Sequence, residues 1–180
     1  MIFRESSLRG AWVIEPEEII DNRGFFARSY CFTEFEKHGL NSRVVQCNIS
    51  YNIQAGTLRG MHYQAEPYEE AKLVRCTKGA IYDVIVDLRR GSPSFRKHFG
   101  VTLSAENHKM LYVPEKFAHG FLTLEDQTEV FYQMSEIHAP ESARGFRWND
   151  PAFGIEWPME PAVISERDRN YPDYGVSSKP

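Results

Sequence analysis

The sequence predicts an all-β fold, a sandwich or barrel, and three observations support this prediction. Between about residues 44 and 135, short apolar or alternating stretches rich in Val, Ile, Tyr, Phe and Leu follow one another. Gly, Pro, Ser and Asn separate these stretches at the spacing typical of antiparallel strands. Only two short segments have a helical pattern. With 180 residues and 42% hydrophobic content, the chain suits one core, so we expect a single domain over 1–180.

The first expected element is a helix over 33–38, because Thr33 and Glu36 have capping-box spacing and Gly39 is a typical stop. Strands are expected at 58–64, 73–77, 81–87, 99–103, 110–113 and 129–134. The third of these strands is the clearest, since the residues after it favour a turn. A short helical turn is expected at 165–168.

The final third of the chain, from Ala139 onward, is rich in Pro and Trp and has little regular patterning. Its large apolar side chains are expected to pack the tail over the barrel or over a partner subunit, because a tail this aromatic is not typical of disorder. They are Phe146, Trp148, Phe153, Ile155 and Trp157.

Charge and hydropathy exclude several classes of protein. The net charge is −4 and the basic residues form no long stripe, so we expect no nucleic-acid partner. No run approaches the roughly 18 apolar residues that cross a bilayer, and the N-terminus lacks a signal-peptide pattern, so we expect no membrane association and a cytoplasmic location. Cys31, Cys47 and Cys76 are odd in number and lack metal-site spacing, which favours reduced, packed thiols.

Two segments, 56–79 and 114–121, resemble the two-part signature of cupins, which are small β-barrels with a polar pocket in the mouth. In the metal-binding cupins, three histidines and a glutamate hold the ion. Here only His62 and His119 remain, and Lys72 stands at the glutamate position, where an ammonium repels a cation. We therefore expect no catalytic metal and no cofactor. A metal-dependent oxygenase or isomerase is the less favoured alternative, and the histidine pair could bind metal weakly.

The remaining polar residues suit proton abstraction next to a carbonyl. His62 is a candidate general base at neutral pH, and Lys72 could stabilise an enolate oxygen. Tyr132 could supply a proton from the opposite face, and Asp168 could orient the base. An acidic chain can also bind an anionic metabolite if Arg23, Arg59, Lys72 and His119 converge in one pocket.

Each candidate also has a structural interpretation. A lone histidine in a strand is often only hydrogen-bonded, and Tyr132 could belong to the core or rim. Asp168 could be a helix-start partner of Ser165, and Lys72 and Arg59 could be solvated.

Strand parity presents a further difficulty for this site. Arg59 and His62 are three residues apart, so an ideal strand places them on opposite faces. Gly60 could mark a bulge that brings both inward.

Eight motifs spread over nearly the whole chain together resemble the dTDP-4-dehydrorhamnose 3,5-epimerase family. They are 21–26, 46–50, 58–64, 72–74, 83–89, 117–121, 148–151 and 165–168. The resemblance implies a cupin-type jelly-roll homodimer that exchanges an N-terminal segment. It also implies a metal-free isomerase acting on a nucleotide-diphosphate 4-keto-6-deoxyhexose, in dTDP-rhamnose biosynthesis for lipopolysaccharide or another surface polysaccharide.

Residue roles carried over from the resemblance divide into two groups. The catalytic group has His62 as base, Asp168 as its dyad partner, Tyr132 as proton donor and Lys72 as enolate stabiliser. The substrate-binding group, in which some members are expected to reach the partner's site, is Arg23, Phe26, Gln46, Asn48, Arg59, Lys72, His119 and His138.

The chain departs from the family pattern at three positions. Arg28 replaces a frequent glutamate, and Lys116 replaces a frequent glycine and is expected to add charge near His119. His138 replaces a tyrosine expected near the reacting sugar, which opens the question of one inversion or two. The alternatives are therefore a 3-epimerase, an epimerase of another nucleotide 4-keto-6-deoxy sugar, or a non-catalytic cupin that binds a sugar nucleotide.

Overall fold

A computed structural model describes residues 1–175 of the chain. The strands are β1 (Ile2–Glu5), β2 (Trp12–Glu15), β3 (Ile19–Asp21), β4 (Gly24–Phe26), β5 (Gln46–Asn52), β6 (Thr57–Gln64), β7 (Lys72–Lys78), β8 (Ala80–Asp87), β9 (His98–Ser104), β10 (Met110–Val113), β11 (Phe117–Thr123), β12 (Thr128–Met134), β13 (Ala143–Gly145) and β14 (Val163–Ile164). The helices are α1 (Phe32–Lys37) and α2 (Glu166–Arg169). The six expected strands correspond to β6 to β10 and β12, each within one residue of its expected ends.

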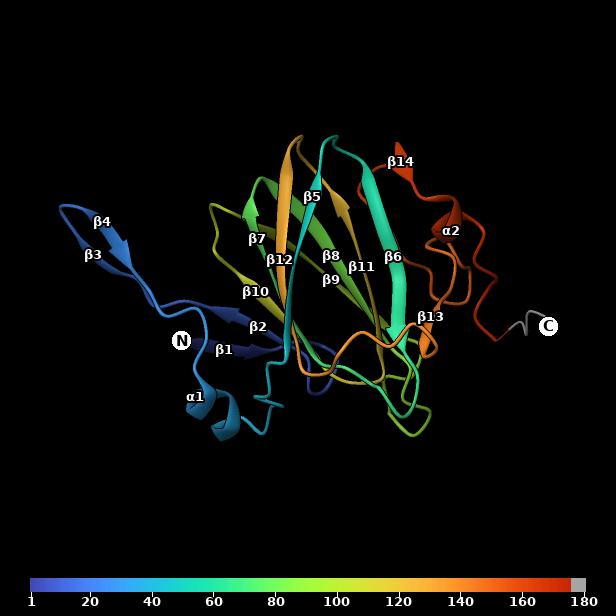
Figure 1. Cartoon of the computed structure of the whole chain (residues 1–180), viewed down its shortest axis with the longest axis horizontal. Helices are drawn as coiled ribbons and strands as arrows, with labels where there is room; N and C mark the ends of the chain where they lie inside the picture. The colour runs from blue at the N-terminus through green and yellow to red at the C-terminus, as the bar shows by residue number, and fades with distance from the viewer. Residues whose placement is uncertain (176–180) are drawn as a thin grey trace.

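Two antiparallel sheets form the barrel (Figure 1). The first has the order β1-β2-β10-β7-β12-β5, and the second has the order β13-β6-β11-β8-β9, with β14 pairing in parallel with β6. The main core lies between them, because it combines Val74 and Val130 of the first sheet with Ile81, Ile85 and Phe121 of the second. The predicted all-β fold, a cupin-type jelly roll, is confirmed.

Strand β11 was not among the expected strands, and its environment explains why. All seven of its residues are buried, so the strand lacks the alternation that marks a half-exposed strand. Gly120 lies in its middle, where glycine normally weakens a strand. A Cβ atom at Gly120 would lie 2.9 Å from the Arg59 carbonyl oxygen, so close packing against β6 requires glycine there.

Helix α1 begins differently from the prediction. Its N-cap is Cys31, which makes no side-chain capping bond, and Thr33 lies inside the helix, so the predicted capping box is wrong. The predicted glycine stop is present. Gly39 has φ of +69°, and the amide of Leu40 donates to the Phe35 carbonyl at 3.1 Å, as in a Schellman motif.

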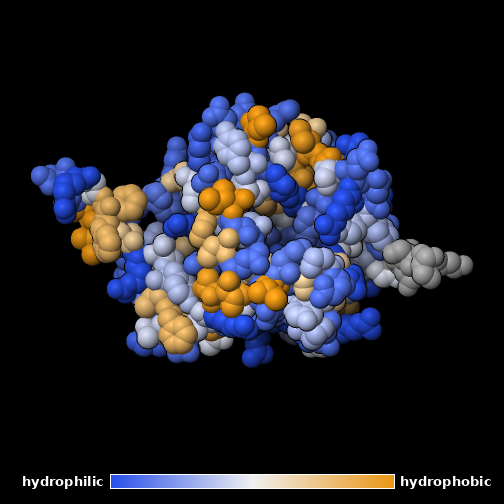
Figure 2. Space-filling model, in the orientation of Figure 1, coloured by the Kyte–Doolittle hydropathy of each residue, from blue (hydrophilic) through white to orange (hydrophobic). Residues whose placement is uncertain are grey.

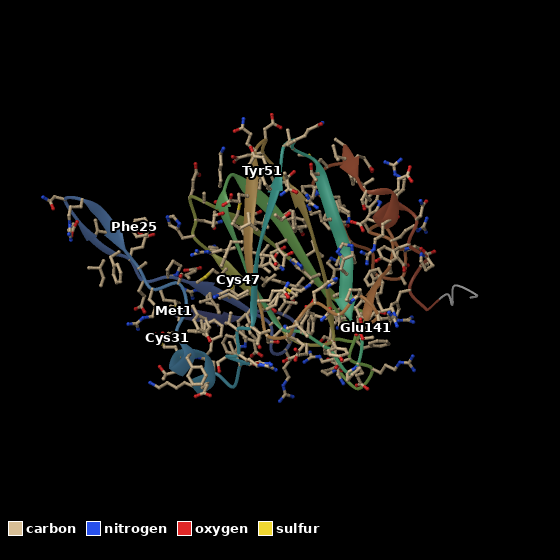
Figure 3. All side chains as sticks on the ribbon, in the orientation of Figure 1. Met1, Phe25, Cys31, Cys47, Tyr51 and Glu141 are labelled. Atoms are coloured by element: carbon tan, nitrogen blue, oxygen red, sulfur yellow. The ribbon has the colours of Figure 1, made fainter. Side chains whose placement is uncertain are left out.

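The hairpin of β3 and β4 projects away from the barrel (Figure 1). Its apolar side chains Ile19, Ile20, Phe25 and Phe26 are all at least half exposed. In Figure 2 the projecting hairpin shows a group of hydrophobic residues next to a hydrophilic tip, and Figure 3 labels Phe25 on this hairpin. Four exposed large apolar side chains on one hairpin are typical of a surface that another protein chain covers.

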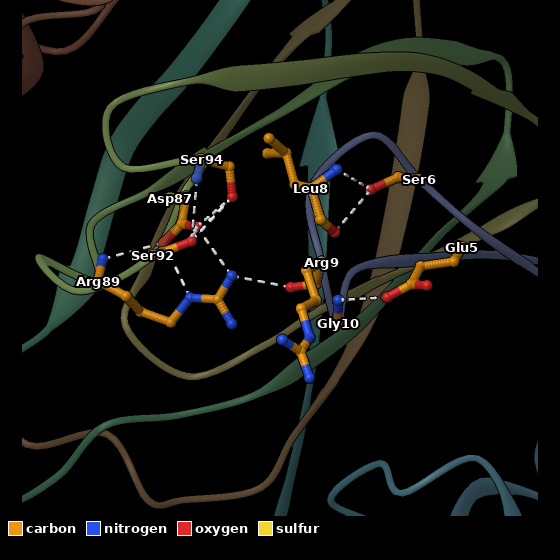
Figure 4. A network of polar contacts seen from close by, with 9 residues as sticks. All are labelled: Glu5, Ser6, Leu8, Arg9, Gly10, Asp87, Arg89, Ser92 and Ser94. Carbon is orange, nitrogen blue, oxygen red and sulfur yellow. Dashed lines mark hydrogen bonds and ion pairs between the residues drawn. The ribbon is translucent and has the colours of Figure 1, made fainter.

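The end of β8 is tied to the turn between β1 and β2 by a buried carboxylate (Figure 4). Asp87 is fully buried and accepts from Arg89 Nε at 2.9 Å, Ser92 Oγ at 2.6 Å and Ser94 Oγ at 2.7 Å. Arg89 also donates to the carbonyl of Arg9 at 2.8 Å. Burial acts to raise the pKa of Asp87, but these hydrogen bonds outweigh it and lower the pKa to about 2.

The aromatic segment after β13 covers the outer face of the second sheet. Phe146 and Phe153 are buried against Met61 and Val84, and Ile155 and Trp157 pack beside them. The indole of Trp157 also donates to the carbonyl of Trp148 at 3.0 Å.

The three cysteines are unpaired, but their environments differ. Cys76 is buried in the core, and burial raises the pKa of its thiol to about 11. Cys31 is partly buried. Cys47 is exposed on β5, so the expectation of packed thiols is wrong for this residue. Within residues 1–175, the two helices are too short and too polar to cross a bilayer.

Candidate active site

A cavity of about 770 Å³ is lined by strands of both sheets and by the segment that leads into α2. A smaller cavity of about 330 Å³ shares His62, Lys72 and Tyr132 with it. Nine of the predicted site residues line one or both cavities. They are Gln46, Asn48, Arg59, His62, Lys72, His119, Tyr132, His138 and Asp168, joined by Arg167, to which the sequence analysis gave no role.

His62 and Asp168 form a hydrogen-bonded pair. His62 Nε2 lies 2.7 Å from Asp168 Oδ1, and the Gly60 amide donates to Asp168 Oδ2 at 3.2 Å. Burial acts to raise the pKa of Asp168, but the hydrogen bond and charge of His62 lead the interactions that bring it below its usual value. The imidazole is 37% exposed, so it can meet a ligand, whereas the carboxylate is buried behind it.

Asp168 makes both of the contacts that its two interpretations require. Its backbone amide donates to Ser165 Oγ at 3.1 Å, as expected for the start of α2. Its side chain points to His62. The helix cap therefore holds the carboxylate that orients the candidate base.

A bulge in β6 solves the parity problem. From Arg59 to His62 the strand advances three residues while β11 advances two, so one extra residue is accommodated. Gly60 lies at this point with φ of +138°, and a Cβ there would lie 2.6 Å from Gly120 Cα. Arg59 and His62 consequently line the same cavity, as the sequence analysis suggested.

A second imidazole–carboxylate pair lies on the neighbouring strands. His119 Nε2 is 2.7 Å from Asp83 Oδ1, and Asp83 is fully buried. Asp83 Oδ2 has no hydrogen-bond partner in the described part of the chain. Asp83 was not among the site residues predicted from the sequence, although a carboxylate inside an apolar strand indicates a buried partner.

The two cationic candidates have different surroundings. Lys72 is largely buried and its Nζ lies 2.8 Å from Glu70 Oε1, so the solvated interpretation is wrong for this lysine. Arg59 is exposed at the cavity mouth, where its Nε donates to Asn52 Oδ1 at 2.8 Å. Glu70 also lines the smaller cavity and was not anticipated from the sequence.

Tyr132 lies on β12 of the first sheet, opposite the sheet that carries His62. The phenol and the imidazole therefore approach the cavity from different walls. This arrangement suits a base and an acid that act on opposite faces of one ligand.

The smaller cavity adds a set of polar groups. Gln46 Nε2 lies 3.3 Å from Asn48 Oδ1, and the His138 amide donates to Gln46 Oε1 at 3.1 Å. Arg167 lines both cavities, and its Nε donates to the Tyr171 hydroxyl at 2.7 Å. These groups suit a polar ligand that extends beyond the candidate catalytic residues.

Four residues singled out from the sequence line neither cavity, namely Arg23, Phe26, Arg28 and Lys116. Arg23 and Phe26 are on the projecting hairpin, and Arg23 pairs with its neighbour Asp21. Arg28 pairs with Glu34 at 3.1 Å.

Lys116 does not add charge beside His119 as expected. Its ammonium lies 2.7 Å from Glu66 and 3.5 Å from Glu69. Its φ of +64° explains why glycine suits this position.

Residues 1–175 contain no group of three or more His, Cys, Asp or Glu side chains arranged to hold a metal ion. The absence of a catalytic metal stays a prediction.

Comparison with known proteins identifies the family. The family profile described as dTDP-4-dehydrorhamnose 3,5-epimerase matches residues 5–175. The chain belongs to this epimerase family. A relative with that name from Methanothermobacter thermautotrophicus is 45% identical over 172 residues, which are 94% of this chain and 92% of the relative.

Solved structures of epimerases have the same fold. The Bacillus anthracis dTDP-4-dehydrorhamnose 3,5-epimerase, with TDP and PPi bound, matches with a TM-score of 0.92 and 42% identity, over 96% of this chain and 98% of that one. ChmJ, a 3′-monoepimerase from Streptomyces bikiniensis in complex with dTDP-quinovose, matches with a TM-score of 0.86 and 34% identity, over 93% and 85%. The family resemblance of the eight motifs is thus confirmed. A 3,5-epimerase and a 3′-monoepimerase both share this architecture.

Proposed function

We propose that this chain inverts C3 and C5 of dTDP-4-dehydro-6-deoxy-D-glucose to give dTDP-4-dehydro-L-rhamnose. The observation that carries the proposal is the oriented pair of His62 and Asp168, which faces Tyr132 across a cavity that also holds Lys72. Membership of the epimerase family and the nucleotide bound in the Bacillus anthracis relative support the substrate class.

His62 is the base. Its Nε2 is engaged by Asp168, so Nδ1 carries the lone pair available to the substrate. Carbons 3 and 5 both flank the C4 ketone, so loss of a proton from either gives an enolate on the same oxygen. Asp168 stabilises the imidazolium that results, as the acidic member of a triad does.

Lys72 and Tyr132 complete the reaction. The ammonium of Lys72 stabilises the negative charge that develops on the C4 oxygen. Tyr132 gives its phenolic proton to the opposite face of the carbanion, and solvent returns the proton from His62 to the phenolate. Bonds to hydrogen are exchanged without net oxidation, so no redox cofactor takes part.

The deciding experiment follows hydrogen exchange in deuterated water by NMR. With dTDP-4-dehydro-6-deoxy-D-glucose, wild-type protein should incorporate deuterium at C3 and C5, and His62→Ala should incorporate none. His98→Gln is the matched control, because His98 bonds to the Phe153 carbonyl away from both cavities. Absence of exchange by the wild type removes the proposed reaction.

The second candidate is a 3-epimerase, favoured by the fold shared with ChmJ and by His138 in the smaller cavity. Deuterium at C3 alone would select it. Another nucleotide sugar is the substrate if exchange appears only with that sugar. Tight binding of every ligand without exchange would indicate a non-catalytic binding protein.

We further propose that the active form is a cytoplasmic homodimer. The exposed apolar surface of the β3–β4 hairpin supports dimerisation, because a second copy would cover it. In such a dimer Arg23 and Phe26 serve the partner's cavity. Supply of rhamnose to lipopolysaccharide or another surface polysaccharide is the corresponding biological role.

A further inference from the structure

Lys72 does not stand alone in the cavity. Its ammonium lies 2.8 Å from Glu70 Oε1, with the two side chains only 12% and 7% exposed. Both residues line the smaller cavity beside His62 and Tyr132. The reaction described above uses the lysine and leaves its carboxylate partner without a role.

The backbone between the two residues is held firmly. The amide of Ala71 donates to Ser135 Oγ at 2.7 Å, and the Ser135 amide donates to the Ala71 carbonyl at 2.9 Å. Because Ala71 lies between Glu70 and Lys72, these bonds fix where both side chains begin. The ion pair then fixes where the lysine side chain ends.

Stability alone does not account for this pair. Glu70 Oε2 is buried and has no hydrogen-bond partner within residues 1–175, which is unfavourable for a carboxylate. Asp87 shows how the fold satisfies a stabilising carboxylate, since both of its oxygens accept hydrogen bonds. Glu70 instead has one oxygen on Lys72 and one without a partner.

We propose that Glu70 is a positioning residue, whose carboxylate fixes the Lys72 ammonium where the C4 oxygen of the substrate gains charge. This inference rests on the proposed epimerase function and deepens it. A lysine side chain is a flexible four-carbon chain, so without a partner its ammonium group occupies many positions. One of its three N–H donors is used by Glu70, which leaves two for the substrate oxygen.

The first test compares Glu70→Gln with Glu69→Gln, which is a matched control. Glu69 is the adjacent glutamate, but its carboxylate faces Lys116 and lines neither cavity. The Glu70 variant should lose about 10- to 100-fold in kcat with little change in KM, because a misplaced ammonium affects mainly the transition state. The control should retain wild-type kcat. Equal kcat values for the two variants would overturn the inference.

A double variant asks whether Glu70 acts through Lys72. Glu70→Gln combined with Lys72→Gln should be no slower than Lys72→Gln alone, since the lysine is already absent. If Glu70→Gln lowers kcat by the same factor in the Lys72→Gln background as in the wild-type background, Glu70 acts independently and the inference is wrong.

Two further measurements separate this inference from folding and from the proposed reaction. Thermal unfolding and calorimetric binding of dTDP should show that Glu70→Gln is folded and still binds the nucleotide. If it does not fold, Glu70→Asp takes its place, because a shorter carboxylate side chain should move the ammonium and lower kcat.

If the wild type shows no exchange, the proposed reaction fails first. A crystal structure of the variant then decides, because an unmoved Lys72 Nζ refutes the positioning role.

Discussion

His62 and His119 lie opposite each other on β6 and β11, and each imidazole is 2.7 Å from its own carboxylate. The two pairs differ in access. His62 is 37% exposed and its partner Asp168 comes from α2, whereas His119 is 10% exposed and its partner Asp83 comes from within the sheet. The first pair therefore suits proton transfer with a ligand, and the second suits a fixed contact.

Replacing Asp168 by Asn should reduce kcat by roughly 10³- to 10⁴-fold, because the amide neither fixes the tautomer of His62 nor stabilises its protonated form. The fold should remain, since Asn can still accept from the Gly60 amide. Steady-state kinetics and circular dichroism check the two parts. A variant with near wild-type kcat would remove Asp168 from its role.

Replacing Asp83 by Asn should act on substrate binding more than on the chemical step. The charge-assisted bond to His119 is lost, so we expect KM to rise about 10-fold while kcat falls less. Kinetics with the same substrate measure both constants. A fall in kcat as large as that of Asp168→Asn would mean that His119 takes part in proton transfer.

Gly60→Ala should destabilise the fold by about 2 kcal/mol or more, because the new Cβ meets Gly120 Cα in a backbone conformation that favours glycine. It should also lower kcat, since the Gly60 amide bonds to Asp168. Denaturant unfolding measures the first effect. Gly91→Ala is the control, because nothing lies within 4 Å of its new methyl group, and it should change stability by less than about 0.5 kcal/mol.

Asp87 should make stability depend on pH in the acid range. Its pKa is lowered from 3.8 to about 2, so its contribution is complete above its unfolded value and is lost as the pH falls from about 4 to 2. The contribution at neutral pH is about 2 kcal/mol. Asp87→Asn should therefore be less stable than wild type at pH 7, and the difference should narrow at pH 2.5. A constant difference in urea unfolding at both pH values would contradict this.

Arg23 should act in the partner's site. Arg23→Ala and His62→Ala are each expected to be nearly inactive alone. Mixed dimers would contain one site with both defects and one with neither, so mixing should restore about one quarter of wild-type activity. Affinity tags on the two variants verify subunit exchange. Full exchange without restored activity would show that Arg23 does not serve the partner.

The local pattern of the chain was enough to predict β6 to β10 and β12, because alternation and turn residues are read within a few positions. It failed where packing overrides local preference, as in the fully buried β11 around Gly120 and in the start of α1 at Cys31. The ion-pair partner of a charged side chain was likewise not predictable from the local sequence. Lys116 pairs with Glu66, 50 residues earlier in the chain. Nothing in the local sequence shows which carboxylate a lysine contacts.

By itself, the sequence determined the all-β class, the family and the chemical groups of the site, since residue types and motif spacing carry that information. Only the tertiary structure decided which groups meet. It joined His62 to Asp168, 106 residues away, it turned Arg59 and His62 to one side through the bulge at Gly60, and it set Glu70 against Lys72. The reason is physical: a side chain's partner depends on register, burial and strand order, which arise only when distant segments pack together.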